Sequence, residues 1–130
     1  MRPIKDEFGL YSESFFDDLV CRERKRSERS QKPFVLIMVE INILAKAKHD
    51  LRSLVGIFED CFRDSDIKGW YKERSVIGIV CPEAANSTDE TIKKKFENTL
   101  EREVPPTVRS ILNISYTWFP ISSIVLLSLE

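Results

Sequence analysis

The chain has 130 residues, of which 42% are hydrophobic and 32% are charged. This length and composition are typical of a globular protein, so we expect residues 1–130 to form one domain. Twenty basic and twenty-one acidic residues give a net charge of −1. This balance provides no overall attraction to nucleic acid or to an anionic membrane, and we expect neither as a partner.

The cysteines indicate a reducing compartment. Cys21, Cys61 and Cys81 are odd in number and widely spaced, which argues against a disulfide framework and a CxxC zinc site. The first ten residues lack the apolar core of a signal peptide, and the apolar tail at 121–129 is too short to span a bilayer. We therefore expect a cytoplasmic protein.

The first half of the chain predicts a helix, a strand and a second helix. Residues 11–31 have a helical apolar stripe, with Ser12 or Ser14 as the N-cap. The unbroken apolar run FVLIMVEINIL follows Pro33 and is typical of a strand that is covered on both faces. Helical spacing of large apolar residues then predicts a helix over roughly 47–64.

The second half predicts two short strands, a helix and a last strand. DIKGWY and SVIGIVCP are joined by the tip Lys72-Glu73-Arg74-Ser75, which contains no glycine. A helix follows the cap Ser87-Thr88-Asp89, and Pro105-Pro106 breaks the chain after it. SILNISYTWFP alternates like a strand, whereas the segment 121–129 is compatible with strand or helix.

This order, a helix followed by β-α-β-β-α-β, predicts an α+β protein. The arrangement is the split βαβ or ferredoxin-like one with an extra N-terminal helix, and we expect both crossover helices on one face of the sheet. Nucleotidyl cyclases and many polymerases use this topology. At the rim beside the first strand and the hairpin, their carboxylates gather two metal ions that neutralise a triphosphate.

Four segments carry a resemblance to one family. LYSESFFDDL is similar to LYNRRxFxxxL, KPFVLIMVEIN to a first strand with a DxD-like end, and ISYTWFP to VSIGVAxxP. FRDSDIKGWYKERSVIGIV follows RxxDxxxRYGGDEFxxxL, with Arg63, Asp66 and Tyr71 matching. Over about residues 8–120 the chain thus resembles the GGDEF domain, the diguanylate cyclase fold that makes cyclic di-GMP in bacteria.

The hairpin tip departs from this family. Aligned through Tyr71, the signature GGDEF becomes Lys72-Glu73-Arg74-Ser75-Val76. Both glycines are replaced, although they let the backbone approach the nucleotide closely. The signature Asp and Glu become Arg74 and Ser75, so a metal ligand and the adjacent catalytic carboxylate are missing. The segment between the first strand and the hairpin, whose loop contacts substrate in active members, is also shorter.

Glu40 is the carboxylate that remains at the family's metal site. It occupies the first-strand position whose Asp binds metal in active members, and one carboxylate does not hold two Mg²⁺ ions. We hypothesise that Arg74 pairs with Glu40 in place of the metal. The single histidine, His49, follows Lys48 at a helix start and indicates an exposed residue rather than a catalytic one. The resemblance therefore implies no catalytic residue, no metal and no cofactor, and a protein that is not an enzyme.

A second nucleotide site of the family is retained in part. Many GGDEF domains bind their product through an RxxD motif five residues ahead of the signature, and Arg63 and Asp66 stand at this spacing. Arginine grips phosphate or guanine, and a carboxylate accepts from guanine N1 and N2. Active members add an Arg from the next helix, where Lys94 stands here. The resemblance implies cyclic di-GMP binding at these residues, although an Asp at this junction also serves as a turn residue.

Three functions are compatible with these features. The first is an inactive GGDEF-like regulatory or interaction domain of a larger signalling or envelope-biosynthesis protein, with a neighbouring domain or a second copy as its partner. The second is a cyclic di-GMP receptor. The third, nucleic-acid binding through the basic cluster at 22–29, is disfavoured because no aromatic residues interleave with the cluster and the net charge is negative.

Overall fold

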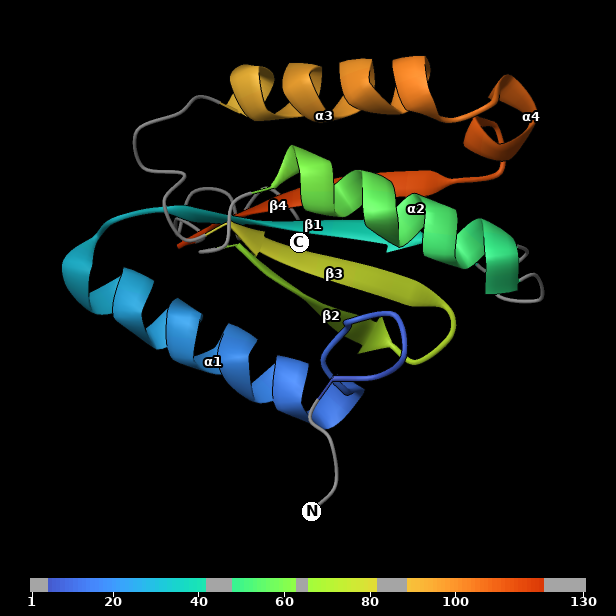
Figure 1. Ribbon diagram of the computed structural model, residues 1–130. Helices are drawn as coiled ribbons and strands as arrows, with labels where there is room; N and C mark the ends of the chain where they lie inside the picture. The colour runs from blue at the N-terminus through green and yellow to red at the C-terminus, as the bar shows by residue number, and fades with distance from the viewer. Residues whose placement is uncertain (1–4, 42–47, 63–65, 82–88, 121–130) are drawn as a thin grey trace.

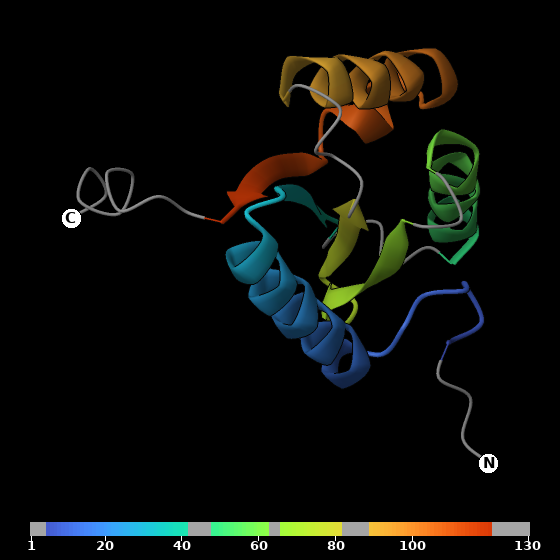
Figure 2. The same ribbon diagram turned by 90° about the vertical axis from the view of Figure 1, so that its left-hand side faces the viewer.

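The computed structural model describes residues 5–41, 48–62, 66–81 and 89–120. These residues form a three-layer α+β structure, in which an antiparallel four-stranded sheet of order β2-β3-β1-β4 lies between helices (Figures 1 and 2). Helices α2 and α3 cover one face and α1 covers the other. The elements are α1 (Glu13–Ser30), β1 (Phe34–Glu40), α2 (Lys48–Cys61), β2 (Ile67–Lys72), β3 (Val76–Cys81), α3 (Asp89–Glu103), α4 (Pro106–Arg109) and β4 (Asn113–Phe119). The predicted fold class is confirmed.

Helix α1 begins and ends at side chains that satisfy its backbone groups. Ser12 is the N-cap, and its hydroxyl accepts a hydrogen bond from the N–H of Phe15 at 3.4 Å. At the other end Gln31 takes a left-handed conformation, and its side-chain Nε2 donates to the carbonyl of Glu28 at 2.6 Å while its backbone N–H donates to the carbonyl of Ser27 at 2.8 Å. No helix in the described ranges is long and apolar enough to cross a membrane.

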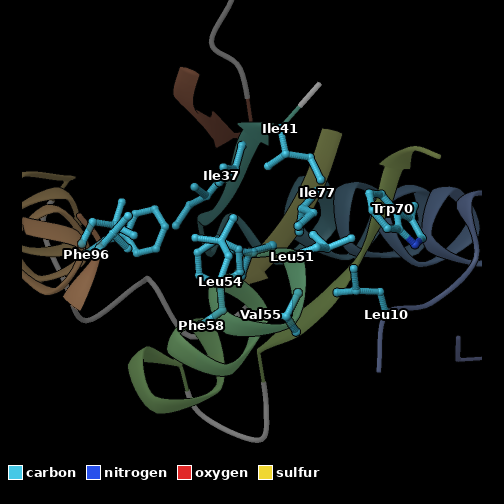
Figure 3. Close-up of a cluster of buried hydrophobic side chains, with 14 of the residues drawn as sticks. Leu10, Ile37, Ile41, Leu51, Leu54, Val55, Phe58, Trp70, Ile77 and Phe96 are labelled. Atoms are coloured by element: carbon cyan, nitrogen blue, oxygen red, sulfur yellow. The ribbon is translucent and has the colours of Figure 1, made fainter. Parts of the chain in front are cut away.

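The burial of β1 on both faces explains its unbroken apolar sequence. Val35, Ile37 and Val39 belong to the main core, which lies between the sheet and the α2–α3 layer. Figure 3 shows Ile37 in this core with Leu54 and other side chains of α2. The alternate β1 residues, Phe34 and Leu36, pack in a second core beneath α1. The predicted two-sided strand is confirmed for its described part.

Phe16 of α1 lies in a socket that two glycines form. Gly69 of β2 and Gly78 of β3 face each other in the antiparallel pair. A Cβ atom on either glycine would lie 2.5 Å from the nearest carbon of the Phe16 ring, which is far shorter than a non-bonded contact between carbon atoms. Phe16 is 1% exposed, so the glycines are needed for close contact between α1 and the β2–β3 hairpin.

The structure differs from the prediction at the end of α2 and after α3. Helix α2 ends at Cys61 and not near residue 64. After α3 the chain forms one further helical turn, α4, where the two prolines predict only the end of a helix. Pro106 is the first residue of α4, a position that tolerates proline because its missing N–H has no partner within the helix. The predicted cap at 87–88 and the segment 121–129 lie outside the described residues.

Replacing Gly78 by alanine tests the socket. We expect the Gly78→Ala change to lower the free energy of unfolding by about 1–3 kcal/mol, because the new methyl group overlaps the Phe16 ring. Gly56→Ala in α2 is the matched control, since nothing lies within 4 Å of the added atom. Better helix propensity should raise stability there by about 0.5–1 kcal/mol. Equal effects of the two changes in urea denaturation would contradict the socket.

Candidate functional site

The end of β1, the hairpin tip and the start of β4 meet at one rim of the sheet. Glu40 is paired with Val76 of β3 on one side and with Asn113 of β4 on the other. The N–H of Ile41 donates to the carbonyl of Ser75 at 2.8 Å. The structure therefore brings Glu40 beside the tip, as the topology predicts.

Glu40 is bound by an amide and not by Arg74. The Oε2 atom of this exposed carboxylate accepts a hydrogen bond from Asn113 Nδ2 at 3.0 Å. The predicted ion pair is wrong, because none joins Glu40 to Arg74 among the described residues. Asn113 stands directly opposite Glu40 in the β1–β4 pair, whereas Arg74 lies in the turn beyond Glu40's partner in β3. The sequence placed Asn113 inside the predicted strand SILNISYTWFP, but it gave no signal for the register that sets Asn113 opposite Glu40.

The hairpin tip is closed by a residue of α1. Glu73, Arg74 and Ser75 form the turn, and the N–H of Ser75 donates to the carbonyl of Lys72 at 3.0 Å. Arg74 has a φ of 63°, the left-handed region that favours glycine. The N–H of Glu73 donates to Oε1 of Glu13, the first residue of α1, at 2.7 Å. Sequence reasoning missed this contact, because sixty residues separate its partners.

The rim lacks a cluster of metal-binding side chains. No group of three or more His, Cys, Asp or Glu residues that could hold a metal ion occurs in the described part of the chain. The segment 42–47, which follows the rim in the sequence, contains none of these residue types. The Glu40 carboxylate is therefore bound by the amide of Asn113, and the neighbouring hairpin tip carries the cationic side chain of Arg74.

A cavity of about 530 Å³ lies between the N-terminal segment, the end of α2 and the start of β2. Its lining is polar and mixed in charge, and includes two ammonium groups, three carboxylates and two aromatic rings. The lining residues are Lys5, Gly9, Tyr11, Glu59, Asp60, Phe62, Asp66, Ile67 and Lys68. Such a lining suits a ligand that carries both hydrogen-bond donors and acceptors.

Of the three residues predicted to bind cyclic di-GMP, the structure places one in the wall of this cavity. Asp66 lines the cavity, and Arg63 lies outside the described residues. Lys94 is exposed on α3 and is not part of the cavity lining. It stands about 200° around the helix from Phe96, whose ring packs against Phe58 and Phe62 of the α2 segment. Lys94 therefore lies on the side of α3 that faces away from α2.

Comparison with known proteins gives a match in structure but none in sequence. No protein-family model matches the chain, and no curated protein matches it. The structure is similar to a DGC protein from Thermotoga maritima, with a TM-score of 0.70, 18% identity and 93% of each chain covered. It is also similar to diguanylate cyclase SiaD from Pseudomonas aeruginosa, solved with its activator SiaC (TM-score 0.66, 16% identity, 97% of this chain and 54% of that chain).

A third similar structure is the GGDEF domain of DgcB from Caulobacter crescentus in complex with c-di-GMP. Its TM-score is 0.65 at 13% identity, and the match covers 91% of this chain and 77% of that chain. At these identities the likeness establishes the architecture. The chain has the nucleotidyl cyclase-like α+β fold, and within that class its fold is that of a GGDEF domain.

Replacing Arg74 by glycine tests the left-handed tip. We expect the Arg74→Gly change to raise the free energy of unfolding by about 0.5–1 kcal/mol, because glycine adopts a positive φ without the strain of a Cβ atom. Lys72→Gly, two residues earlier in β2, is the control and should lower stability, since a strand residue gains nothing from that freedom. Thermal unfolding of the two variants gives the comparison. A loss of stability in Arg74→Gly would contradict the tip geometry.

Proposed function

We propose that the chain is a catalytically inactive GGDEF-like domain that regulates or positions a protein partner. The observation that carries this proposal is the hydrogen bond from the Glu73 N–H to the Glu13 carboxylate. By the family resemblance, Glu73 occupies the place of a glycine whose backbone approaches the nucleotide. In this chain the N–H of Glu73 donates to the Glu13 side chain of α1. This supports a structural role for the hairpin tip and not a role in substrate binding.

The charges at the rim support the same proposal. Two Mg²⁺ ions need several converging carboxylates, and Glu40 is the one that the resemblance places at the metal position. Its carboxylate is bound by Asn113, and Arg74 carries a positive charge where the family has a metal-binding Asp. A guanidinium on the tip beside the rim opposes the binding of a divalent cation.

The proposed partner is a neighbouring domain or a second copy of the chain. The exposed side of α1 is acidic near its start and mainly basic towards its end. The exposed charged residues include Asp17 and Asp18 at the start, and Arg22, Lys25, Glu28 and Arg29 towards the end. Such a surface suits charged protein contacts. SiaD, solved with its activator SiaC, is a similar structure that has a protein partner. The proposal places the domain in a larger bacterial signalling or envelope-biosynthesis protein in the cytoplasm, where the free cysteines Cys21, Cys61 and Cys81 stay reduced.

An activity assay tests the loss of catalysis. Incubation of the chain with GTP and Mg²⁺ should give no cyclic di-GMP by liquid chromatography, because the rim does not hold the two ions. A matched variant that restores the first four residues of the signature carries Lys72→Gly, Glu73→Gly, Arg74→Asp and Ser75→Glu. It should gain Mn²⁺ binding beside Glu40, seen as broadening of the Ile41 and Val76 amide signals. Product from the unaltered chain would overturn the proposal.

The second candidate function is reception of cyclic di-GMP, and the cavity beside Asp66 favours it. In this proposal Arg63 grips phosphate or guanine, and Asp66 accepts from guanine N1 and N2. Lys94, which the family resemblance adds to this site, faces away from α2 and is not among the cavity residues on which this proposal rests. The GGDEF domain of DgcB, solved with c-di-GMP, has a similar fold.

Calorimetry with cyclic di-GMP tests this second function. We expect binding in the micromolar range, weakened by at least about tenfold in Arg63→Ala because a charged, two-pronged contact is lost. Arg102→Ala, an exposed arginine near the end of α3, is the control and should leave the affinity unchanged. Absence of heat with the unaltered chain would exclude the receptor function and leave the interaction domain as the proposal.

A further inference from the structure

Residues 5–11, here called the N-terminal strap, are held together by the side chain of Asp6. Its Oδ1 atom accepts hydrogen bonds from the N–H groups of Phe8 and Leu10 at 2.9 and 3.0 Å. Its backbone N–H and carbonyl bond to Leu10 and Gly9 of the same loop. The strap is therefore a folded loop with an aspartate at its centre.

The same aspartate fastens the strap to the sheet. Trp70 of β2 donates from its indole Nε1 to Oδ2 of Asp6 at 2.7 Å, across sixty-four residues of sequence. Trp70 is 4% exposed, whereas Asp6 is exposed, so the bond joins the core to the surface loop. A short bond from a buried N–H to a carboxylate is among the stronger hydrogen bonds of a protein.

The strap also forms one wall of the cavity that contains Asp66. Lys5, Gly9 and Tyr11 supply that wall. Tyr11 bonds to the edge of β2, where its N–H donates to the carbonyl of Lys68 at 3.3 Å and its carbonyl accepts from the N–H of Trp70 at 3.0 Å. The strap (dark blue in Figure 1) thus runs beside the strand that carries the opposite wall.

We infer that ligand binding in this cavity and attachment of the strap are thermodynamically linked, with Asp6 as the positioning residue. This inference rests on the receptor function proposed above. A ligand held between the strap and β2 gains contacts with Lys5 and Tyr11 when the strap is attached, so it favours the attached state. The strap leads directly into Ser12, the cap of α1. Ligand binding in the cavity is therefore coupled, through the strap, to the helix that is proposed to contact the protein partner.

Two substitutions disrupt the attachment of the strap to Trp70 from opposite ends of the Asp6–Trp70 bond. Asp6→Asn leaves one acceptor oxygen and puts an NH2 donor in place of the other, so the side chain no longer accepts from both Trp70 and the strap N–H groups. Trp70→Phe removes the indole donor but keeps an aromatic ring in the core. The control is Glu7→Gln in the same strap. It weakens the exposed ion pair between Glu7 and Arg52, whose atoms are 3.3 Å apart, and leaves the cavity wall unchanged.

The experiment is calorimetry with cyclic di-GMP, combined with hydrogen exchange of the strap amides. We expect Asp6→Asn and Trp70→Phe to weaken binding by about tenfold. Glu7→Gln should change it by no more than about twofold, since exposed ion pairs contribute little. The ligand should slow exchange of the Phe8, Leu10 and Tyr11 amides in the unaltered chain, and much less so in Asp6→Asn.

Each result decides the inference. If the unaltered chain binds cyclic di-GMP and a folded Asp6→Asn variant binds it equally well, the linkage is overturned while the receptor function stands. A lower melting temperature of Asp6→Asn with unchanged affinity and unchanged ligand protection gives Asp6 a structural role alone and also overturns the linkage. If the unaltered chain shows no binding, the receptor function fails and the linkage fails with it.

Discussion

The contact between the Phe16 ring and the paired glycines Gly69 and Gly78 fixes the geometry of the whole hairpin side of the molecule. Without a Cβ atom on either glycine, the ring reaches the sheet backbone and α1 lies close against β2 and β3. A helix held at this distance places its first residue, Glu13, beside the N–H of Glu73. It also fixes the end of the strap, because Tyr11 immediately precedes the helix cap.

Much of the fold could be predicted because its signals are local in the sequence. The apolar run from Phe34 indicated a strand buried on both faces, and the pair Ser12 and Ser14 indicated the start of α1, where Ser12 is the cap. The order of the elements then determined the topology, including the position of Glu40 beside the hairpin. These inferences need only periodicity, caps and the rules of chain connection.

The contacts of the rim could not be predicted in the same way, because they join residues that are far apart in the sequence. Charge alone suggested Arg74 as the partner of Glu40, but the strand register placed Asn113 opposite it. The bonds from Glu73 to Glu13 and from Trp70 to Asp6 likewise depend on how closely α1 and the strap approach the sheet. That approach is set by Gly69 and Gly78, which a pattern of apolar residues does not reveal.

A shared fold leaves open what the rim does, because function depends on the side chains that the fold carries. In this chain α1, seated on the glycine socket, holds the tip closed through Glu13. Hydrogen exchange of the Glu73 amide in Phe16→Leu measures this role of α1 most directly, with the Ile37 amide as the report on global unfolding. We predict exchange of Glu73 faster by about tenfold, as for loss of one buried contact that orders a loop, while exchange of Ile37 rises only by the factor that the lost global stability gives. An unchanged rate at Glu73 would show that the tip is held without the helix, and would contradict a tip closed by α1.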